Sequence, residues 1–152
     1  MSYNELINKQ QTEGCKINDI NWFDEDDEDL QALRASMQAR YDDFQRVIET
    51  INAEYDCSLR MTCEACPVQV EGTIDGNGLY FRARWDAWGL AIAATVKQAI
   101  AAGRSTDAIF FHKSCAGVFD GSWLEPEQLE TVLRACLTAY RSGAKNGGYI
   151  EL

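Results

Sequence analysis

Two short pairs of residues have the types and spacing needed to bind a zinc ion. Cys63 and Cys66 form a Cys-x-x-Cys pair, and His112 and Cys115 form a His-x-x-Cys pair. Thiolate and imidazole are ligands that zinc prefers, and each spacing lets two side chains hold one ion. The four residues together therefore predict a small zinc-binding domain as one hypothesis. Free thiols, with no metal and no other cofactor, are the simpler interpretation.

The same residues raise two catalytic hypotheses. A redox-active Cys-x-x-Cys begins a helix that follows a strand, whereas Cys63 and Cys66 come before a predicted strand. His112 is the single histidine of the chain, so a hydrolase or transferase with a Cys/His or Ser/His nucleophile must use it. No nucleophile elbow, phosphate loop or metalloprotease motif accompanies it. We therefore assign no catalytic residue and keep an enzyme that uses His112 as an alternative.

A long helix is predicted over residues 29–56, before these cysteines. Its apolar residues recur every three or four positions and form one stripe: Leu30, Leu33, Met37, Tyr41, Phe44, Ile48, Ile51 and Tyr55. A helix of this length is about 40 Å long. We expect this apolar stripe to pack on a sheet. Two alternatives are that part of it faces a partner protein or that it joins two copies of the chain as a homodimer.

After the helix, the apolar period changes to two, which predicts half-buried strands in an antiparallel meander. A two-residue loop at Gly76 and Asn77, of type II′, is expected to join two of these strands. The resulting pairs are Val68 with Trp85, Val70 with Ala83, Gly72 with Phe81, Glu71 with Arg82, Gln69 with Arg84 and Thr73 with Tyr80. A second turn over residues 86–89 continues the meander.

Two helices and one more strand complete the predicted order. Thr95 and Gln98 form a capping box, and Gly103 is expected to end that helix in a left-handed conformation. A strand over residues 108–113 follows. The last helix opens with Pro126 in its first turn and ends at Gly143.

These elements predict an α+β fold, an antiparallel β-meander packed against a long N-terminal helix and a C-terminal helix. With 152 residues, of which 46% are hydrophobic, the chain is long and apolar enough for one core. We expect a single domain over residues 1–152. It comprises an acidic, polar N-terminal segment (1–28), the long helix (29–56) and an α+β core (57–152).

The negative charge of the chain lies almost entirely in its N-terminal third. Residues 1–56 carry 14 acidic and 5 basic side chains, whereas residues 57–152 carry 10 and 9. Six acids follow two aromatic residues in an unbroken run: Trp22, Phe23, Asp24, Glu25, Asp26, Asp27, Glu28 and Asp29. Acids before a helix stabilise its positive end, which is the simplest role for the run. Such a field also repels nucleic acids and anionic membranes over about 8 Å and attracts basic surfaces.

Arginines and aromatic residues are predicted to share the polar face of the sheet. They are Arg60, Arg82, Arg84 and Tyr80, with Trp85 and Trp88 nearby. Arginines beside aromatic rings on a sheet can stack on single-stranded bases. The excess negative charge opposes that function. Cross-strand pairing, or docking of the chain's own acidic segment, is the simpler role for these arginines.

The start of the chain lacks the basic and apolar regions of a signal peptide, and no apolar run reaches about 18 residues. We therefore expect a cytoplasmic protein that does not enter a membrane. In that compartment its six cysteines are expected to stay reduced.

The segment from Cys66 to Trp88 reads CPVQVEGTIDGNGLYFRARWDAW. It resembles a segment of small uncharacterised proteins of bacteria and their phages. The resemblance covers under a fifth of the chain and has no chemistry attached to it, so it assigns no functional residue. It implies an accessory bacterial or phage protein.

The charge and the long helix together favour a protein that works by binding. We expect an acidic inhibitor, of the immunity or phage anti-defence type, that engages a basic protein surface. The acids from Asp24 to Asp29 are its expected contacts, with Trp22 and Phe23 as apolar anchors. A mimic of DNA charge that occupies a nucleic-acid-binding protein is a sharper form of the same hypothesis. Direct binding of nucleic acid is not expected.

Overall fold

The computed structural model of the chain describes residues 28–64, 67–103, 110–113 and 120–143, the third range by its backbone alone. These residues form α2 (Glu28–Tyr55), β1 (Cys57–Glu64), β2 (Val68–Ile74), β3 (Asn77–Arg84), β4 (Ala87–Ala93), α3 (Val96–Gly103), β5 (Phe110–Lys113), the 3-10 helix η2 (Asp120–Trp123) and α4 (Pro126–Arg141). The predicted α+β fold is confirmed. The chain divides into two compact units, residues 1–43 and 44–152, with the boundary inside α2, and the single domain stays a prediction.

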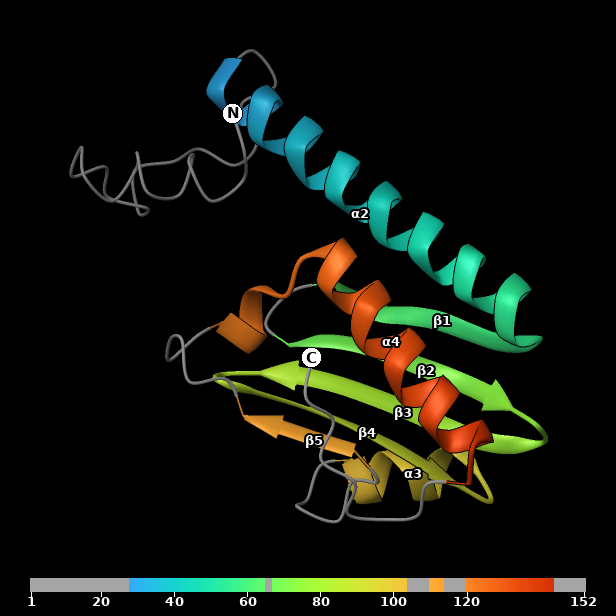
Figure 1. Ribbon diagram of the computed structural model, residues 1–152. Helices are drawn as coiled ribbons and strands as arrows, with labels where there is room; N and C mark the ends of the chain where they lie inside the picture. Colours follow the sequence, from blue (N-terminus) through green and yellow to red (C-terminus); the bar gives the residue numbers. More distant parts are fainter. Residues whose placement is uncertain (1–27, 65–66, 104–109, 114–119, 144–152) are drawn as a thin grey trace. The chain divides into compact units, whose positions relative to one another are not determined.

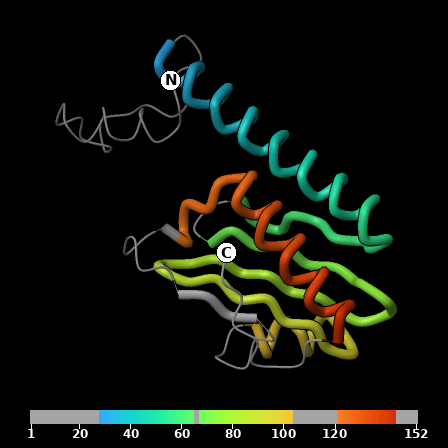
Figure 2. Tube along the Cα trace, viewed as in Figure 1, coloured from blue at the N-terminus to red at the C-terminus, as the bar shows by residue number. Residues whose placement is uncertain are grey.

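The second unit is built on a five-stranded antiparallel sheet whose strands follow chain order from β1 to β5. Figures 1 and 2 show the first four strands following one another from green to yellow, with α4 crossing one face. Two-residue turns join β2 to β3 and β3 to β4. β1 and β5 form the two edges of this sheet.

One face of the sheet carries the core. The second half of α2 and the inner side of α4 pack there on buried strand residues. The main members are Phe44, Ile48 and Ile51 from α2, Leu129, Leu133 and Leu137 from α4, and Val68, Val70, Leu79, Phe81 and Leu90 from the strands. α3 covers part of the opposite face, where Ala99 packs with Tyr80 and Ala91. Among the described helices, α2 and α4 therefore pack on one face of the sheet and α3 packs on part of the other.

A single residue connects α2 to the edge strand β1. Asp56 has a φ of 45°, the left-handed conformation that ends many helices. The chain turns back at once, so that Asn52 of α2 reaches the outer side of β1. The amide of Asn52 donates to the Leu59 carbonyl at 2.9 Å and accepts from the Leu59 N–H at 2.7 Å. Asn52 therefore takes the place of a neighbouring strand at the middle of this edge.

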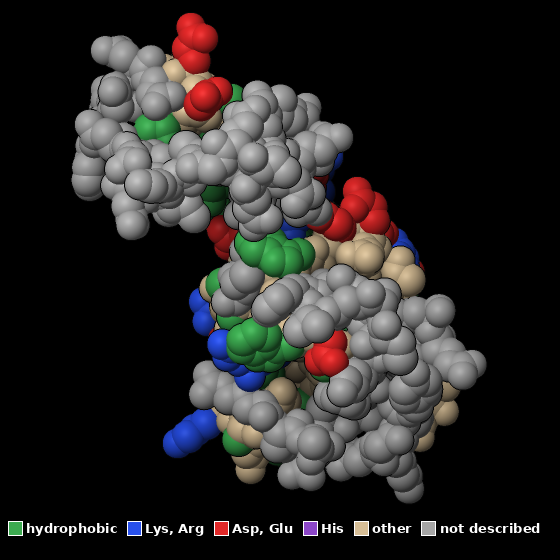
Figure 3. All heavy atoms as spheres, turned by 90° about the vertical axis from the view of Figure 1, so that its left-hand side faces the viewer, with side chains coloured by type: hydrophobic (Ala, Val, Ile, Leu, Met, Phe, Trp, Pro, Cys, Tyr) green, Lys and Arg blue, Asp and Glu red, His purple; other side chains and the backbone are tan. Residues whose placement is uncertain are grey.

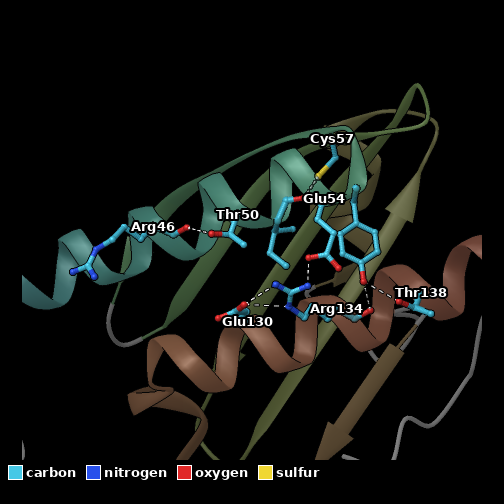
Figure 4. Close-up of polar contacts among 9 residues, drawn as sticks. Arg46, Thr50, Glu54, Cys57, Glu130, Arg134 and Thr138 are labelled. Atoms are coloured by element: carbon cyan, nitrogen blue, oxygen red, sulfur yellow. Dashed lines mark hydrogen bonds and ion pairs between the residues drawn. The ribbon is translucent and has the colours of Figure 1, made fainter.

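Polar contacts fasten the second half of α2 to α4 (Figure 4). Arg134 of α4 forms ion pairs with Glu54 of α2 and, at 2.8 Å, with Glu130 of its own helix. The hydroxyl of Tyr55 lies 2.8 Å from that of Thr138. These contacts fix the two helices beside each other above the core.

The predicted register of the β2–β3 hairpin is wrong by two residues. Val68 pairs with Ala83, where the sequence analysis placed Trp85. The loop is Asp75–Gly76, whose φ values of 49° and 77° are both positive, as a type I′ turn requires. Aspartate tolerates the left-handed conformation and glycine adopts it freely, so Asp-Gly is preferred over Gly-Asn. A shift of two keeps every side chain on its predicted face.

α3 lies where the sequence predicts it, but its glycine has another role. The Thr95 hydroxyl accepts a hydrogen bond from the Gln98 N–H at 3.3 Å, as expected of a cap. Gly103 is the last residue of α3 and is not left-handed; the left-handed glycines of the described residues are Gly76 and Gly143. A β-carbon on Gly103 would lie 2.5 Å from Cδ1 of Tyr80. A glycine is therefore required at position 103 because the helix approaches the sheet closely there, and not because the backbone is left-handed.

Candidate functional site

The structure describes only the last two residues of the predicted partner-binding segment. Glu28 and Asp29 occupy the first turn of α2 and are both exposed. Carboxylates there stabilise the helix through its dipole. The other members lie outside the described residues: Trp22, Phe23, Asp24, Glu25, Asp26 and Asp27. Their part in binding stays a prediction.

The apolar stripe of α2 is exposed at Met37 and Tyr41 and buried on both sides of them. At its start Leu30 is buried, with 5% of its surface exposed. The last four residues of the stripe belong to the core: Phe44, Ile48, Ile51 and Tyr55. Met37 is 50% exposed and Tyr41 is 41% exposed. Met37 and Tyr41 are thus the exposed members of the stripe, between the buried Leu30 and the core residue Phe44.

Charges of both signs accompany the exposed part of the stripe. At about 100° per residue, Arg34 and Arg40 flank Met37 and Tyr41 around the helix, and Ala39 lies on the opposite side. Both arginines make contacts of their own within the chain. The first half of α2 therefore carries apolar residues bordered by charges of both signs, rather than a continuous acidic patch.

The structure does not bring the predicted zinc ligands together. Cys63 lies in β1 and the backbone of His112 lies in β5, at opposite edges of the sheet. Four spacings of about 4.8 Å separate these strands, about 19 Å, too far for two side chains to hold one ion. Cys66 and Cys115 lie outside the described residues, among which no three His, Cys, Asp or Glu side chains are grouped for a metal. Zinc at either pair alone stays a prediction, which elemental analysis of the purified protein tests.

Two thiols of the second unit are poor nucleophiles. Burial raises the pKa of Cys136, which lies in the core. Burial is also the main reason that the pKa of Cys57 is raised; Arg141 lowers that pKa, and Asp56 and Asp75 raise it further. Because the thiolate is the reactive form, neither cysteine is suited to redox or covalent chemistry at neutral pH.

Raising the pH above 9 is expected to destabilise the protein in part through Cys136. Its ordinary pKa of 9.0 applies to the unfolded chain, whereas burial keeps the proton in the folded protein. Unfolding therefore releases a proton above pH 9, and the free energy of unfolding falls by up to about 1.4 kcal/mol per pH unit. Urea unfolding of the wild type and Cys136→Ala at two alkaline pH values tests this. The variant should lose less stability as the pH rises, and equal losses would contradict the prediction.

The face of the sheet opposite the core carries the predicted arginines. Arg60 of β1 pairs across the sheet with Glu71 of β2, and their side chains form an ion pair at 3.4 Å. Glu71 faces Tyr80 on its other side, not Arg82 as predicted, because of the corrected register. Figure 3 shows basic side chains gathered beside hydrophobic ones along the left side of the lower part of the molecule.

Two of the three aromatic residues predicted near these arginines are buried. Tyr80 lies under α3, and Trp88 lies in the core, 6.1 Å from the ring of Phe81. Trp85 is the exposed one. Tyr80 therefore shares the sheet face of the arginines, as predicted, but α3 covers it, whereas Trp88 lies on the core face. Neither ring is exposed for base stacking.

Trp85 lies in a strained turn, where the sequence analysis placed the end of a strand. It is the first residue of the two-residue β3–β4 loop and has a φ of 59°. A bulky side chain in this region costs about 1–2 kcal/mol, which is why glycine is preferred there. The start of η2 holds the turn. The Trp85 carbonyl accepts from the Gly121 N–H at 2.7 Å, and the Trp85 N–H donates to the Ser122 hydroxyl at 2.8 Å.

Glycine at position 85 is expected to be better tolerated than alanine. Trp85→Gly relieves the left-handed strain, whereas Trp85→Ala keeps a β-carbon in that conformation. We expect the glycine variant to be more stable than the alanine variant by about 1 kcal/mol, measured by urea unfolding. In an ordinary strand or helix the order is the reverse. An alanine variant as stable as the glycine variant would show that the turn is not left-handed in solution.

Comparisons with known proteins identify no relative. No family model matches the chain, no curated protein is similar to it in sequence, and no solved structure resembles it in fold. The functional residues of the chain must therefore be inferred from its own structure. Among the described residues, every helix is too short or too polar to cross a membrane.

Proposed function

We propose that this protein is a binding protein that anchors a partner on the exposed part of the α2 stripe, at Met37 and Tyr41. The carboxylates that begin the helix, together with the acids that precede them in sequence, direct it to a basic surface. An inhibitor of the immunity or phage anti-defence type, acting in the cytoplasm, is the specific form of this proposal.

The half-buried stripe is the observation that carries the proposal. One continuous stripe is core from Phe44 onward, whereas Met37 and Tyr41 earlier in it remain about half exposed. An amphipathic helix that enters a hydrophobic groove uses anchors at this spacing. Side chains such as Met and Tyr are enriched where partners meet.

The acidic side chains affect binding differently from the apolar anchors Met37 and Tyr41. Glu28 and Asp29 are exposed at the end of the helix that follows the acidic run. Complementary charge at the rim of an interface speeds association and selects partners, more than it tightens the final complex. Replacing the acids from Asp24 to Asp29 by the matching amides should therefore slow association and weaken its salt dependence.

A second copy of the chain is the other occupant that an observation favours. Met37 and Tyr41 of one copy can pack against the same two residues of an antiparallel copy, as a two-fold interface requires. Light scattering over a range of concentrations separates the two occupants. A monomer that captures a basic protein from its host supports the proposal, and a homodimer whose formation depends on Met37 and Tyr41 would replace it.

A further inference from the structure

We infer that the sheet face opposite the core binds a carboxylate-rich peptide segment, with Arg82 at the centre of the site. This surface, the arginine face, consists of Arg60, Arg82 and Arg84 with Trp85 at its end. Its evidence comes from the sheet alone and does not depend on the function proposed for α2.

Arg82 carries a hydrogen-bond donor that the described residues do not satisfy. Its Nε–H is buried and meets no acceptor among them. Its cross-strand neighbours are Gln69 in β2 and Gly89 in β4. Neither of these residues offers a carboxylate. A buried donor on a charged group is destabilising unless a partner supplies the acceptor.

The neighbouring arginines make the face positive although the chain is negative overall. The side chain of Arg60 is 76% exposed, and its contact with Glu71 is long, at 3.4 Å. The guanidinium of Arg84 lies over the ring of Trp85, 5.0 Å from its centre. Glu71 is thus the one carboxylate among these residues. An acidic segment would supply the charge that this face lacks.

The strained turn supplies the second reason to expect a ligand here. Trp85 occupies a position that favours glycine, and its side chain is half exposed. Strain of this kind persists where the surrounding structure enforces it, and it is concentrated at binding sites. The hydrogen bonds from η2 to the backbone of Trp85 keep its indole beside the arginine face. There the ring can pack against the apolar part of a bound peptide side chain.

A peptide carboxylate fits this face better than a nucleic-acid strand does. Guanidinium groups bind carboxylates through two parallel hydrogen bonds. A single strand needs successive exposed rings for its bases, whereas Tyr80 and Trp88 are buried.

Fluorescence anisotropy with the full chain tests the inference, using a rhodamine-labelled oligoglutamate peptide as the probe at low salt. We expect Arg82→Gln to weaken binding about tenfold, because a hydrogen bond between charged groups is lost. Arg60→Gln and Arg84→Gln, at more exposed positions, should each weaken it about threefold. Arg46→Gln makes the same change of charge on α2 and should leave binding unchanged.

Two results would overturn the inference. One is a failure of the expected binding to the peptide. The wild type would then not bind oligoglutamate, or Arg82→Gln would bind it equally well while giving the same circular dichroism spectrum as the wild type. If Arg82→Gln does not fold, the Arg60→Gln, Arg84→Gln double variant decides in its place. The other is tighter binding of an oligothymidine than of the peptide, which would assign the face to single-stranded nucleic acid.

Discussion

Replacing Asn52 by leucine is expected to lower the free energy of unfolding by about 3 kcal/mol and to make the protein aggregate. The side chain of Asn52 satisfies both the N–H and the carbonyl of Leu59. Leucine removes both bonds and leaves two partly buried backbone groups without partners. Each lost hydrogen bond costs about 1 kcal/mol, and the unpaired groups add to that loss.

The aggregation follows from the position of Leu59. β1 is an edge of the sheet, and an edge strand with free N–H and carbonyl groups can pair with another chain. Asn52 blocks that pairing at the middle of β1. A bulge between Met61 and Cys63 disrupts the ladder further along.

Urea unfolding and light scattering measure the two effects. Gln38→Leu is the matched control, because Gln38 is also on α2 and its amide donates to the exposed Asp42 of the same helix. The control should change stability by less than about 0.5 kcal/mol. An Asn52 variant as stable and as soluble as this control would contradict the role assigned to Asn52.

Replacing Met37 and Tyr41 together by glutamine is expected to weaken partner binding more than tenfold while leaving the fold intact. The two side chains are about half exposed, so binding can bury roughly half of each. Full burial of such a side chain stabilises a complex by about 1.5–3 kcal/mol, so half of two such burials amounts to a tenfold change or more. Glutamine keeps the helix because its helix propensity is high.

Stability measurements separate this surface role from a core role. The double variant should retain the wild-type free energy of unfolding to within about 1 kcal/mol, since neither side chain is buried in the free protein. Ile48→Gln, in the buried half of the same stripe, should lose several kcal/mol. Comparable losses in both variants would mean that Met37 and Tyr41 also belong to a core.

Periodicity predicted the elements of this fold well. The helix expected over residues 29–56 spans Glu28–Tyr55, and the period-two segments became strands. The last helix begins at Pro126 and ends before Gly143, which has a left-handed φ of 88°. These patterns depend on the local geometry of helices and strands, so they can be predicted from the spacing of residues along the chain.

The hairpin register depends on which of two alternative two-residue turns forms around Gly76. Gly76 fits either the first position of a type II′ turn or the second position of a type I′ turn. Asp75 decides between them because it tolerates a positive φ. Both registers place the same side chains on the same face, so the hydrophobic pattern does not distinguish them.

The candidate sites were harder to predict because they depend on tertiary contacts. The stripe of α2 shows which face is apolar, but it does not show that Phe44 is covered whereas Met37 is exposed. Likewise, the spacing of Cys63 and His112 along the chain does not reveal that the strand order places them at opposite edges. The strain at Trp85 arises from the turn that the corrected register creates.

Site-specific photo-crosslinking in the native host tests the central claim most directly. A benzophenone side chain placed at Met37 or Tyr41 should crosslink to one and the same basic protein, and a benzophenone at Ala39, on the opposite side of the helix, should not. Equal crosslinking from all three positions, or none from positions 37 and 41, would contradict the account.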